Sequence, residues 1–347
     1  MPLSARIALV MRAPKKPLEP QLRQSFFSLS PDHVLNSVEA ALQKDYSGLR
    51  ISGKSFALNS LENRVYEIEI EEEIQGERSI VAKFYRPGRW TKEQILEEHR
   101  FVQELKNAEI PVIAPLQELQ QTADGIYFVL FPKVRGRLKD ELRPDELRQL
   151  GRFIGQIHTV GARFESHCRH KLTLENFGRK SLKTLLESPF LNENIRPYYE
   201  KTCLDLFQII EKRMQHVFTQ SIHGDCHVGN VLWNESGPFI LDFDDMLVGP
   251  PVQDLWMISK GRNEEDLQLR EELIQGYEMM RDFDRSTLSL VEPLRALRMI
   301  HYSAWIARRW DDPSFPRMFT QFTTQQYWNE EIEALNEILN LINGYSF

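Results

Sequence analysis

Residues 223–230 read His-Gly-Asp-Cys-His-Val-Gly-Asn, and residues 241–245 read Leu-Asp-Phe-Asp-Asp. Two short apolar runs, 231–233 and 239–241, lie between the polar stretches, and Asn-Glu-Ser-Gly at 234–237 separates them. Such a polar stretch between two apolar runs is typical of a β-hairpin turn. The spacing therefore predicts a polar loop, a hairpin, and an aspartate at the end of the second strand.

The residue types in this stretch fit phosphoryl transfer. That reaction needs a carboxylate to position an attacking hydroxyl and oxygen ligands to hold magnesium on a triphosphate. Asp225 is predicted to be the base, and Asn230, five residues later, to reach the metal. Asp242 would hold the same metal from a rigid strand end, and we count it with Asp225 as catalytic. The alternative, a polar turn followed by an acidic strand end, is disfavoured by the spacing.

A lysine and a glutamate nearer the N-terminus fit the same chemistry. Lys83 ends an otherwise apolar strand, where a cation is costly unless it meets anions. On the helix predicted from Thr91 to Asn107, Glu98 lies within an apolar stripe at helical spacing. Glu97 is expected to point about 100° away from that stripe. A Lys83–Glu98 pair would direct the lysine toward phosphate, although both residues could instead be ordinary surface charges.

The segment 58–66 occupies the place of a phosphate-binding loop but contains no glycine. Asn59, Ser60 and Asn63 favour turns and offer side-chain donors. We therefore expect backbone N–H groups and Ser60 to contact ATP. The alternative is a plain turn between two strands.

The hydrophobic periodicity changes near residue 132. Ser30 followed by Pro31 predicts the start of a helix. From there to residue 132 the pattern mostly alternates with a period of two, which is typical of antiparallel strands, with a turn predicted at Gln75–Glu77 and one helix embedded. Beyond it, helical patterns prevail, and helices are predicted at about 144–161, 193–217, 252–260, 264–281, 286–310 and 324–343. We predict an α+β, two-lobed fold, with a mobile leader at 1–24, a β-rich ATP-binding lobe at 25–132 and a mostly helical catalytic and substrate lobe at 133–347.

Composition narrows the class of protein. The chain has 347 residues, with 43 basic and 50 acidic side chains and a formal net charge of −7, which is unfavourable for general nucleic-acid binding. Three cysteines are too few for a disulfide framework, and no apolar run approaches the length of a membrane span. The expected protein is cytoplasmic and monomeric, with neither a nucleic-acid nor a membrane partner.

Several motifs together resemble the bacterial stress response kinase A family. That family lies in the aminoglycoside-phosphotransferase and choline-kinase branch of the protein-kinase-like superfamily. The matching stretches are His223–Asn230, Asp242–Asp244, Leu58–Tyr66, Lys83–Pro87, Ile95–His99, Gln253–Met257, Glu292–Ala296 and Arg308–Trp310. The resemblance spans residues 26–330 and implies an ATP- and magnesium-dependent kinase that phosphorylates serine and threonine of proteins, itself included, in a bacterial stress response.

Two other functions stay open at this stage. A small-molecule kinase of the aminoglycoside, choline or homoserine type would use the same catalytic residues, because its acceptor is also a hydroxyl. A module that binds ATP without catalysis would lack the base or a metal ligand, and this chain lacks neither.

Further residues receive supporting roles. His223 is expected to buttress the loop, and His227 to pack there rather than bind metal. Cys226 is read as structural, and Asp254 as a helix N-cap that braces the loop. On the predicted helix over 286–310, five residues share one stripe that could contact substrate or the loop, although such a stripe is more often a packed amphipathic face: Arg295, Arg298, Tyr302, Trp305 and Arg309.

The stretch between Asp242 and Asp254 is also informative. Residues 243–253 contain no Ser, Thr or Tyr. Kinases that are switched by phosphorylation carry a longer segment with such a residue there. We therefore predict activity that needs no phosphorylation of this segment.

Overall fold

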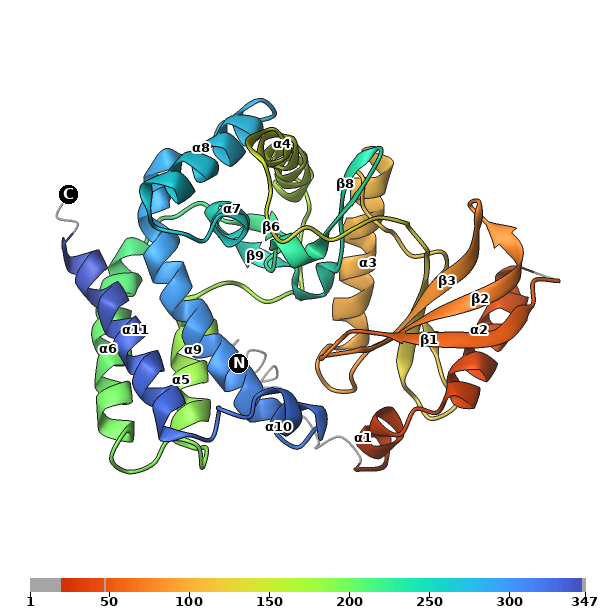
Figure 1. The fold of residues 1–347 in the computed structure, drawn as a ribbon, viewed down its shortest axis with the longest axis horizontal. Coiled ribbons are helices and arrows are strands. Elements are labelled where there is room, and N and C mark those ends of the chain that lie inside the picture. The colour runs from red at the N-terminus through yellow and green to blue at the C-terminus, as the bar shows by residue number, and fades with distance from the viewer. Residues whose placement is uncertain (1–19, 47, 345–347) are drawn as a thin grey trace, which may run out of the picture. The chain divides into compact units, whose positions relative to one another are not determined.

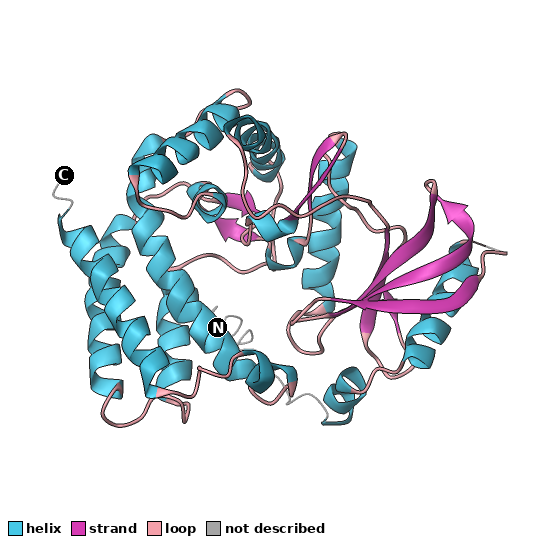
Figure 2. Cartoon of the chain, in the orientation of Figure 1, coloured by secondary structure: helices cyan, strands magenta, loops and turns pink. Residues whose placement is uncertain are grey.

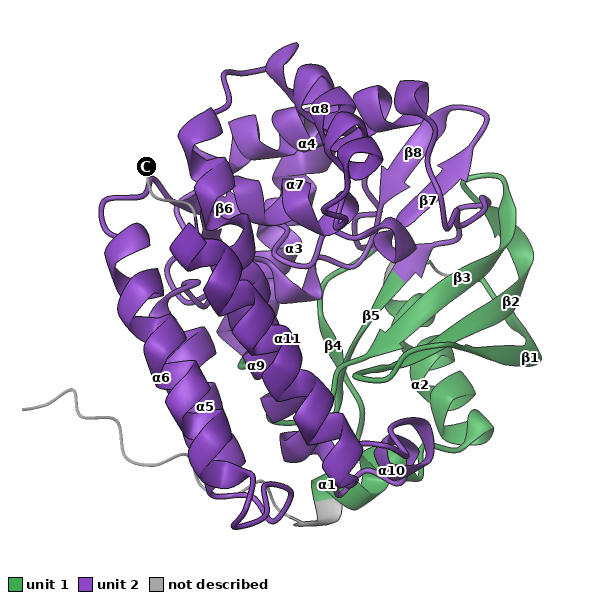
Figure 3. Cartoon of the chain, turned by 60° about the vertical axis from the view of Figure 1, so that its left-hand side comes forward, with its two compact units in different colours: residues 1–91, 117–130 green, residues 92–116, 131–347 purple. Residues whose placement is uncertain are grey.

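The computed structural model describes residues 20–46 and 48–344, which form two compact units (Figure 3). Unit 1 comprises the described residues up to Thr91 together with Gln117–Leu130, and unit 2 comprises Lys92–Leu116 and the described residues from Phe131 onward. Residues 1–19 of the predicted leader lie outside the described residues. The rest of that segment belongs to helix α1 (Pro20–Phe27).

Unit 1 is built on a five-stranded sheet with the strand order β1-β2-β3-β5-β4 (Figure 1). The pairs β1–β2, β2–β3 and β4–β5 are antiparallel. The strands are β1 (Ile51–Leu58), β2 (Arg64–Ile74), β3 (Glu77–Phe84), β4 (Gln120–Gln121) and β5 (Tyr127–Pro132).

Helix α2 (Pro31–Asp45) packs against β1 and begins as the sequence predicts. The Ser30 hydroxyl accepts a hydrogen bond from the His33 backbone N–H, and Pro31 occupies the first turn, where its missing N–H costs nothing. Val34 and Val38 are fully buried on one face of this helix. The predicted turn between β2 and β3 is present, with Gln75 and Gly76 at positive φ.

Unit 2 is mostly helical (Figure 2). Its helices are α3 (Lys92–Asn107), α4 (Pro144–Gly161), α5 (Lys180–Leu186), α6 (Arg196–Arg213), α7 (Val252–Ile258), α8 (Glu264–Glu278), α9 (Val291–Arg309), α10 (Ser314–Met318) and α11 (Gln325–Gly344), with short helical turns η1 (Leu174–Arg179), η2 (Val228–Asn230), η3 (Phe243–Asp245) and η4 (Arg285–Leu290). Helix α4 has the predicted bounds. The structure adds the π-helical turn η1, α5 and α10, for which the sequence offered no long periodic pattern.

Two small antiparallel pairs of strands support the polar loop of unit 2. The predicted hairpin is present as β7 (Val231–Asn234) and β8 (Gly237–Ile240). The second pair, β6 (Gln220–Ile222) with β9 (Leu247–Gly249), was not predicted, because each strand is only three residues long. The two pairs flank residues 223–230 and 241–246 and hold them in the interior of the unit.

Helix α3 belongs to unit 2, whereas the predicted lobe 25–132 included it. The ring of Phe101 lies 4.9 Å from that of Phe164 and 6.0 Å from that of Phe243, so the apolar face of α3 packs into the core of unit 2. Within the described ranges, no helix combines the length and the apolar character required to cross a membrane.

Candidate active site

The 223–230 loop is fixed from inside by His223. Its imidazole is 1% exposed, and Nε2 lies 2.8 Å from the carbonyl oxygen of Leu241. Nδ1 accepts a hydrogen bond of 3.3 Å from the backbone N–H of Asp225. This pattern places the proton on Nε2 and connects the loop to the end of the hairpin. His223 therefore has the buttressing position that the sequence predicts.

Asp254 holds the backbone of the 223–230 loop through hydrogen bonds. Its carboxylate accepts hydrogen bonds from the backbone N–H groups of His223 at 2.8 Å and Gly224 at 2.9 Å. Nε2 of the fully buried His158 lies 2.9 Å from the same carboxylate. The predicted bracing is present, but the predicted N-cap position is wrong. Asp254 lies inside the first turn of α7, which Pro251 precedes as the cap residue.

Gly224 permits the sharp turn before Asp225. Its φ is +84°, and a Cβ at this position would lie 2.4 Å from the carbonyl oxygen of Asp245. Only glycine accommodates both the left-handed backbone and this approach. The loop can therefore pass directly over the segment that follows Asp242.

The carboxylate of Asp225 has two cationic or potentially cationic neighbours. Arg298 Nη2 lies 2.7 Å from Oδ1, and His227 Nε2 lies 3.6 Å from Oδ2. Burial favours the neutral acid, but contact with His227 and the charge of Arg298 outweigh it and lower the pKa of Asp225 to about 2. Asp225 is consequently a carboxylate, fixed through Oδ1, at neutral pH.

Asn230 and Asp242 come together through the backbone. Asn230 Nδ2 donates a hydrogen bond of 3.0 Å to the carbonyl oxygen of Asp225, which leaves the amide oxygen as the atom able to bind a cation. The backbone N–H of Leu241 donates to the carbonyl oxygen of Asn230 at 2.9 Å, so Asp242 follows directly beside this residue. Asp242 has φ +58° and ψ +66°, a conformation that is costly for aspartate and typical of functional sites.

These oxygen donors fit magnesium. Mg²⁺ is usually held by one or two protein carboxylates or carbonyls, with substrate phosphates and water completing its shell. The described residues contain no group of three or more His, Cys, Asp or Glu side chains able to hold a metal by themselves. An amide oxygen of Asn230 and the carboxylate of Asp242 match this partial, nucleotide-dependent type of site.

The neighbouring residues have structural roles. Cys226 is 1% exposed, and burial, together with the charges of Asp254 and Asp225, raises the pKa of its thiol well above the usual range. His227 caps η2 by accepting the Gly229 N–H at 3.1 Å and also faces Asp225. The contact with Asp225 goes beyond the packing role that the sequence favoured for His227.

The segment that follows Asp242 is held on two sides. β9 pairs with β6, and Val248 also exchanges backbone hydrogen bonds with His170 and Leu172, at 2.9 and 2.8 Å. The buried Arg169 donates to the carbonyl oxygens of Asp244 and Met246. Backbone pairing and Arg169 thus hold this short segment, and the prediction that it needs no phosphorylation stays a prediction.

Helix α3 contributes a residue whose role the sequence missed. Glu97 is 6% exposed and accepts hydrogen bonds from the backbone N–H groups of His167 and Cys168 at 3.0 Å each, as well as from the Ser166 hydroxyl. The sequence placed Glu97 about 100° away from the apolar stripe and did not predict that it is buried. Glu98 is also buried, at 2% exposure, as its place in the apolar stripe predicts. Glu97 is buried because loop 166–168 covers its side of α3.

The candidate nucleotide-binding residues of unit 1 lie on a rigid turn and strand. The Ser60 hydroxyl accepts the backbone N–H of Asn63 at 3.2 Å, and Asn63 Oδ1 accepts that of Arg86 at 3.2 Å. The Arg86 guanidinium donates to the carbonyl oxygens of Leu61 and Glu62. The glycine-free turn is thus held by Arg86, a contact between residues about 25 positions apart that no local pattern revealed.

Lys83 lies on β3 at 7% exposure, with its Nζ 5.2 Å from the ring centroid of Tyr85. Its predicted partner Glu98 belongs to unit 2, so the Lys83–Glu98 pair stays a prediction.

The residues of the predicted stripe on α9 make different contacts. Arg298 reaches Asp225 of the loop, as described above. Arg295 lies over the Trp256 ring at 5.1 Å and donates to the carbonyl oxygen of Lys260. Tyr302 is 44% exposed and stacks on Trp305, with ring centroids 5.4 Å apart.

Comparison with known proteins decides the family. A model of the phosphotransferase enzyme family matches residues 56–290, which include the 223–230 loop, Asp242 and Lys83. The chain belongs to this family. Stress response kinase A of Escherichia coli K12 is 37% identical over 308 residues, which cover 88% of this chain and 90% of the relative. The Salmonella typhimurium protein named serine/threonine protein kinase RdoA is 33% identical over 323 residues, with 92% and 95% covered.

Solved structures of the family share the fold at low sequence identity. A complex of the amicoumacin kinase with AMP-PNP, Ca²⁺ and amicoumacin has a TM-score of 0.64 at 17% identity, covering 81% of this chain and 88% of that one. The structure of the microcompartment-associated aminopropanol kinase has a TM-score of 0.60 at 17% identity, covering 89% of this chain and 97% of that one. The structure of choline kinase from Cryptosporidium parvum has a TM-score of 0.58 at 14% identity, covering 88% of this chain and 98% of that one. The predicted protein-kinase-like α+β fold and the resemblance to stress response kinase A are both confirmed, and the protein is a phosphotransferase of the kinase type.

Proposed function

We propose that this protein is an ATP- and magnesium-dependent serine/threonine protein kinase that also phosphorylates itself. The observation that carries the proposal is the geometry of Asp225: a carboxylate fixed by Arg298 on the same loop as Asn230 and beside Asp242. The names of its relatives, stress response kinase A and serine/threonine protein kinase, support a protein acceptor and a role in a bacterial stress response.

Asp225 is suited to orient a hydroxyl. Arg298 engages Oδ1 at 2.7 Å, whereas His227 Nε2 lies 3.6 Å from Oδ2, so Oδ2 is the less tightly held oxygen and the one that would accept the hydrogen bond of the acceptor hydroxyl. As the acceptor oxygen bonds to the γ-phosphorus, the bond from that phosphorus to the bridging oxygen of ADP breaks and the hydroxyl proton passes to Asp225. A carboxylate with a pKa of about 2 is a weak base, so its main contribution is positioning until late in the reaction.

The proposal gives four groups of residues a role toward the nucleotide. Asn230 and Asp242 would hold Mg²⁺, which neutralises developing charge on the phosphates when bound. Ser60 would contact the phosphates from its turn, and Lys83, oriented by Glu98, would do so from β3. For the departure of ADP, these residues need only position the phosphates and stabilise their negative charge.

A second candidate function is a small-molecule kinase, because several solved relatives phosphorylate small hydroxyl compounds by their names. Amine-containing acceptors such as aminoglycosides or choline are best bound beside acidic side chains. The neighbours of Asp225 on α9 are basic instead, with Arg298 in contact and Arg295 one turn away. This charge pattern favours a protein acceptor over a cationic small molecule.

We further propose that the protein is cytoplasmic and monomeric, and that it binds neither nucleic acid nor membranes.

The test is phosphate transfer from labelled ATP with magnesium. The acceptors are the chain itself, a generic protein substrate, and a panel of aminoglycosides, choline and homoserine, with Asp225→Asn as the matched variant. We expect label on serine or threonine of protein, and its loss in Asp225→Asn. Label confined to a small molecule would overturn the protein-kinase proposal while keeping the mechanism, and full activity of Asp225→Asn would overturn the assignment of the base.

A further inference from the structure

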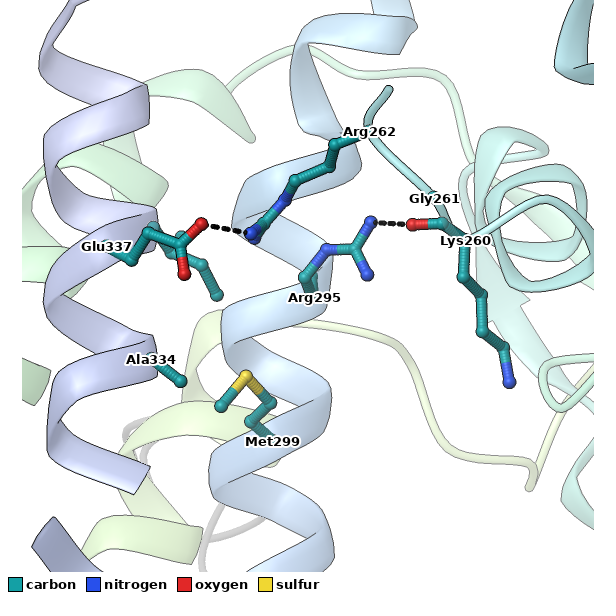
Figure 4. Close-up of a pocket in the computed structure, with 8 residues that line it drawn as sticks. Lys260, Gly261, Arg262, Arg295, Met299, Ala334 and Glu337 are labelled. Atoms are coloured by element: carbon teal, nitrogen blue, oxygen red, sulfur yellow. Dashed lines mark hydrogen bonds and ion pairs between the residues drawn. The ribbon is translucent and has the colours of Figure 1, made fainter. Parts of the chain in front are cut away.

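A basic pocket lies in unit 2 at the start of α9 (Figure 4). It has a volume of about 330 Å³ and is lined on one side by Lys260, Arg262 and Arg295 and on the other by apolar and acidic residues of α9 and α11. Met299 and Ile338 form its apolar floor. No role follows for this pocket from the phosphoryl-transfer residues already described.

The two arginines of the pocket are held in place by acidic residues. Arg262 forms a two-bond pair with Glu292, at 3.1 and 2.7 Å, and a third contact with Glu337 at 2.6 Å. Arg295 Nε lies 3.2 Å from Glu292. Their charges are therefore largely balanced, and their guanidinium planes form a rigid wall.

Lys260 differs from the two arginines. Its side chain is exposed and, in Figure 4, extends away from the Arg262–Glu337 pair. Within the residues that the structure describes, no hydrogen bond or ion pair engages its ammonium group. The backbone that carries it is nevertheless fixed, because Arg295 donates to the carbonyl oxygen of Lys260, and Arg270 donates to those of Ser259 and Gly261. Three consecutive carbonyl groups are thus held by two partly buried arginines, which fix the loop that presents the Lys260 ammonium.

The pocket lies close to the proposed base. Arg295 donates to the carbonyl oxygen of Lys260 and lies one helical turn before Arg298, which contacts Asp225. Met299, in the pocket wall, directly follows Arg298 in α9. Because glutamates balance Arg262 and Arg295, the ammonium of Lys260 is the pocket charge that an incoming anion would balance.

We propose that the pocket of Lys260, Arg262 and Arg295 binds an anionic side chain of the acceptor protein, a carboxylate or a phosphorylated residue, near the hydroxyl that is phosphorylated. The inference rests on the proposed function and specifies its substrate class. Arg295 and Arg298 are about 4.5 Å apart along the helix axis, and an extended peptide advances about 3.3 Å per residue. The anion is thus expected about one to three residues from the acceptor.

The test uses the full chain and synthetic serine peptides that differ at one position. Each peptide carries glutamate, phosphoserine or alanine at one to three residues on either side of the acceptor serine. Fluorescence anisotropy gives the Kd of each peptide, and labelled ATP gives kcat/KM. We expect the wild-type protein to prefer an anionic peptide over the alanine peptide about tenfold, and the comparison of glutamate with phosphoserine identifies the source of the charge.

Variants separate this subsite from general electrostatics. Lys260→Gln should remove most of the preference and Lys260→Arg should keep it. Lys183→Gln, at an exposed lysine of α5 that pairs with Glu187, is the matched control and should keep it as well. Equal binding of anionic and neutral peptides by the wild-type protein, or an unchanged preference in Lys260→Gln, would overturn the proposal. Preferential binding of anionic peptides without phosphate transfer to any peptide would instead overturn the proposed function and leave the subsite standing.

Discussion

The ion pair between Arg298 and Asp225 allows the effect of a neighbouring charge on the pKa of the proposed base to be measured. Replacing Arg298 by glutamine keeps a polar side chain of similar length but removes its charge from a distance of 2.7 Å. Two unit charges at this distance interact by about 6 kcal/mol at an effective dielectric constant of 20. Solvent reduces this value, because the two side chains are 37% and 23% exposed, and we expect about 1–3 kcal/mol to remain.

That energy converts into a change in proton affinity. A tenfold change in proton affinity corresponds to about 1.4 kcal/mol, so the pKa of Asp225 should rise from about 2 to about 3–4, and burial acts in the same direction. The wild-type carboxylate stays ionised across the usual assay range. In Arg298→Gln, the protonated and inactive form should accumulate as the pH falls toward 4, and kcat/KM should fall with it.

The assay is kcat/KM for peptide phosphorylation between pH 4 and 9, with circular dichroism to verify folding at each pH. Arg298→Gln should show an acid limb that the wild-type protein lacks, and Arg298→Lys should restore most of the wild-type profile. Parallel profiles for wild type and Arg298→Gln, whatever their relative height, would refute the electrostatic role and leave Arg298 with a purely structural one.

Three further predictions concern stability and activation. Burial raises the pKa of Glu331 to about 7 from the ordinary 4.5, so the free energy of unfolding should fall by about 3 kcal/mol as the pH rises from 4.5 to 7; urea unfolding of Glu331→Gln should lack this fall, and equal pH dependence would contradict it. Gly276→Ala should cost about 1–3 kcal/mol, because its Cβ would lie 2.1 Å from the Arg148 carbonyl oxygen, whereas Gly344→Ala, with open space around it, should cost nothing in the same measurement. Protein shown by mass spectrometry to carry no phosphate should already transfer phosphate at its full initial rate, and a lag that disappears after preincubation with ATP would argue against an always-ordered segment after Asp242.

Local signals account for the parts of the fold that the sequence predicts well. Ser30 followed by Pro31 marks the start of α2, and both features act within one turn. The turn residues between β7 and β8 similarly indicate a hairpin at the correct positions. Helix α4 has its predicted bounds because proline begins it and a long amphipathic pattern continues it.

Contacts between distant residues account for what the sequence missed. The partners of Glu97 are about 70 positions away, so its burial depends on where loop 166–168 folds back and not on the helical period of α3. The clamp of Arg86 on the turn after β1 is of the same kind. Periodicity places Arg298 on a stripe but does not show that this residue, 73 positions after Asp225, reaches its carboxylate. Side-chain reach across the fold is invisible to any local pattern.

The stripe on α9 links two charge-dependent steps through one rigid element. Arg298 holds the base, and Arg295, one turn earlier, holds the loop that presents Lys260. A displacement of α9 would therefore alter the orientation of Asp225 and the proposed acceptor subsite together. Because the two contacts use different residues, their variants should separate: Arg298→Gln is expected to change the pH profile for every peptide, and Lys260→Gln to change only the choice among peptides. Variants with identical effects would mean that α9 acts as one electrostatic unit and not as two adjacent sites.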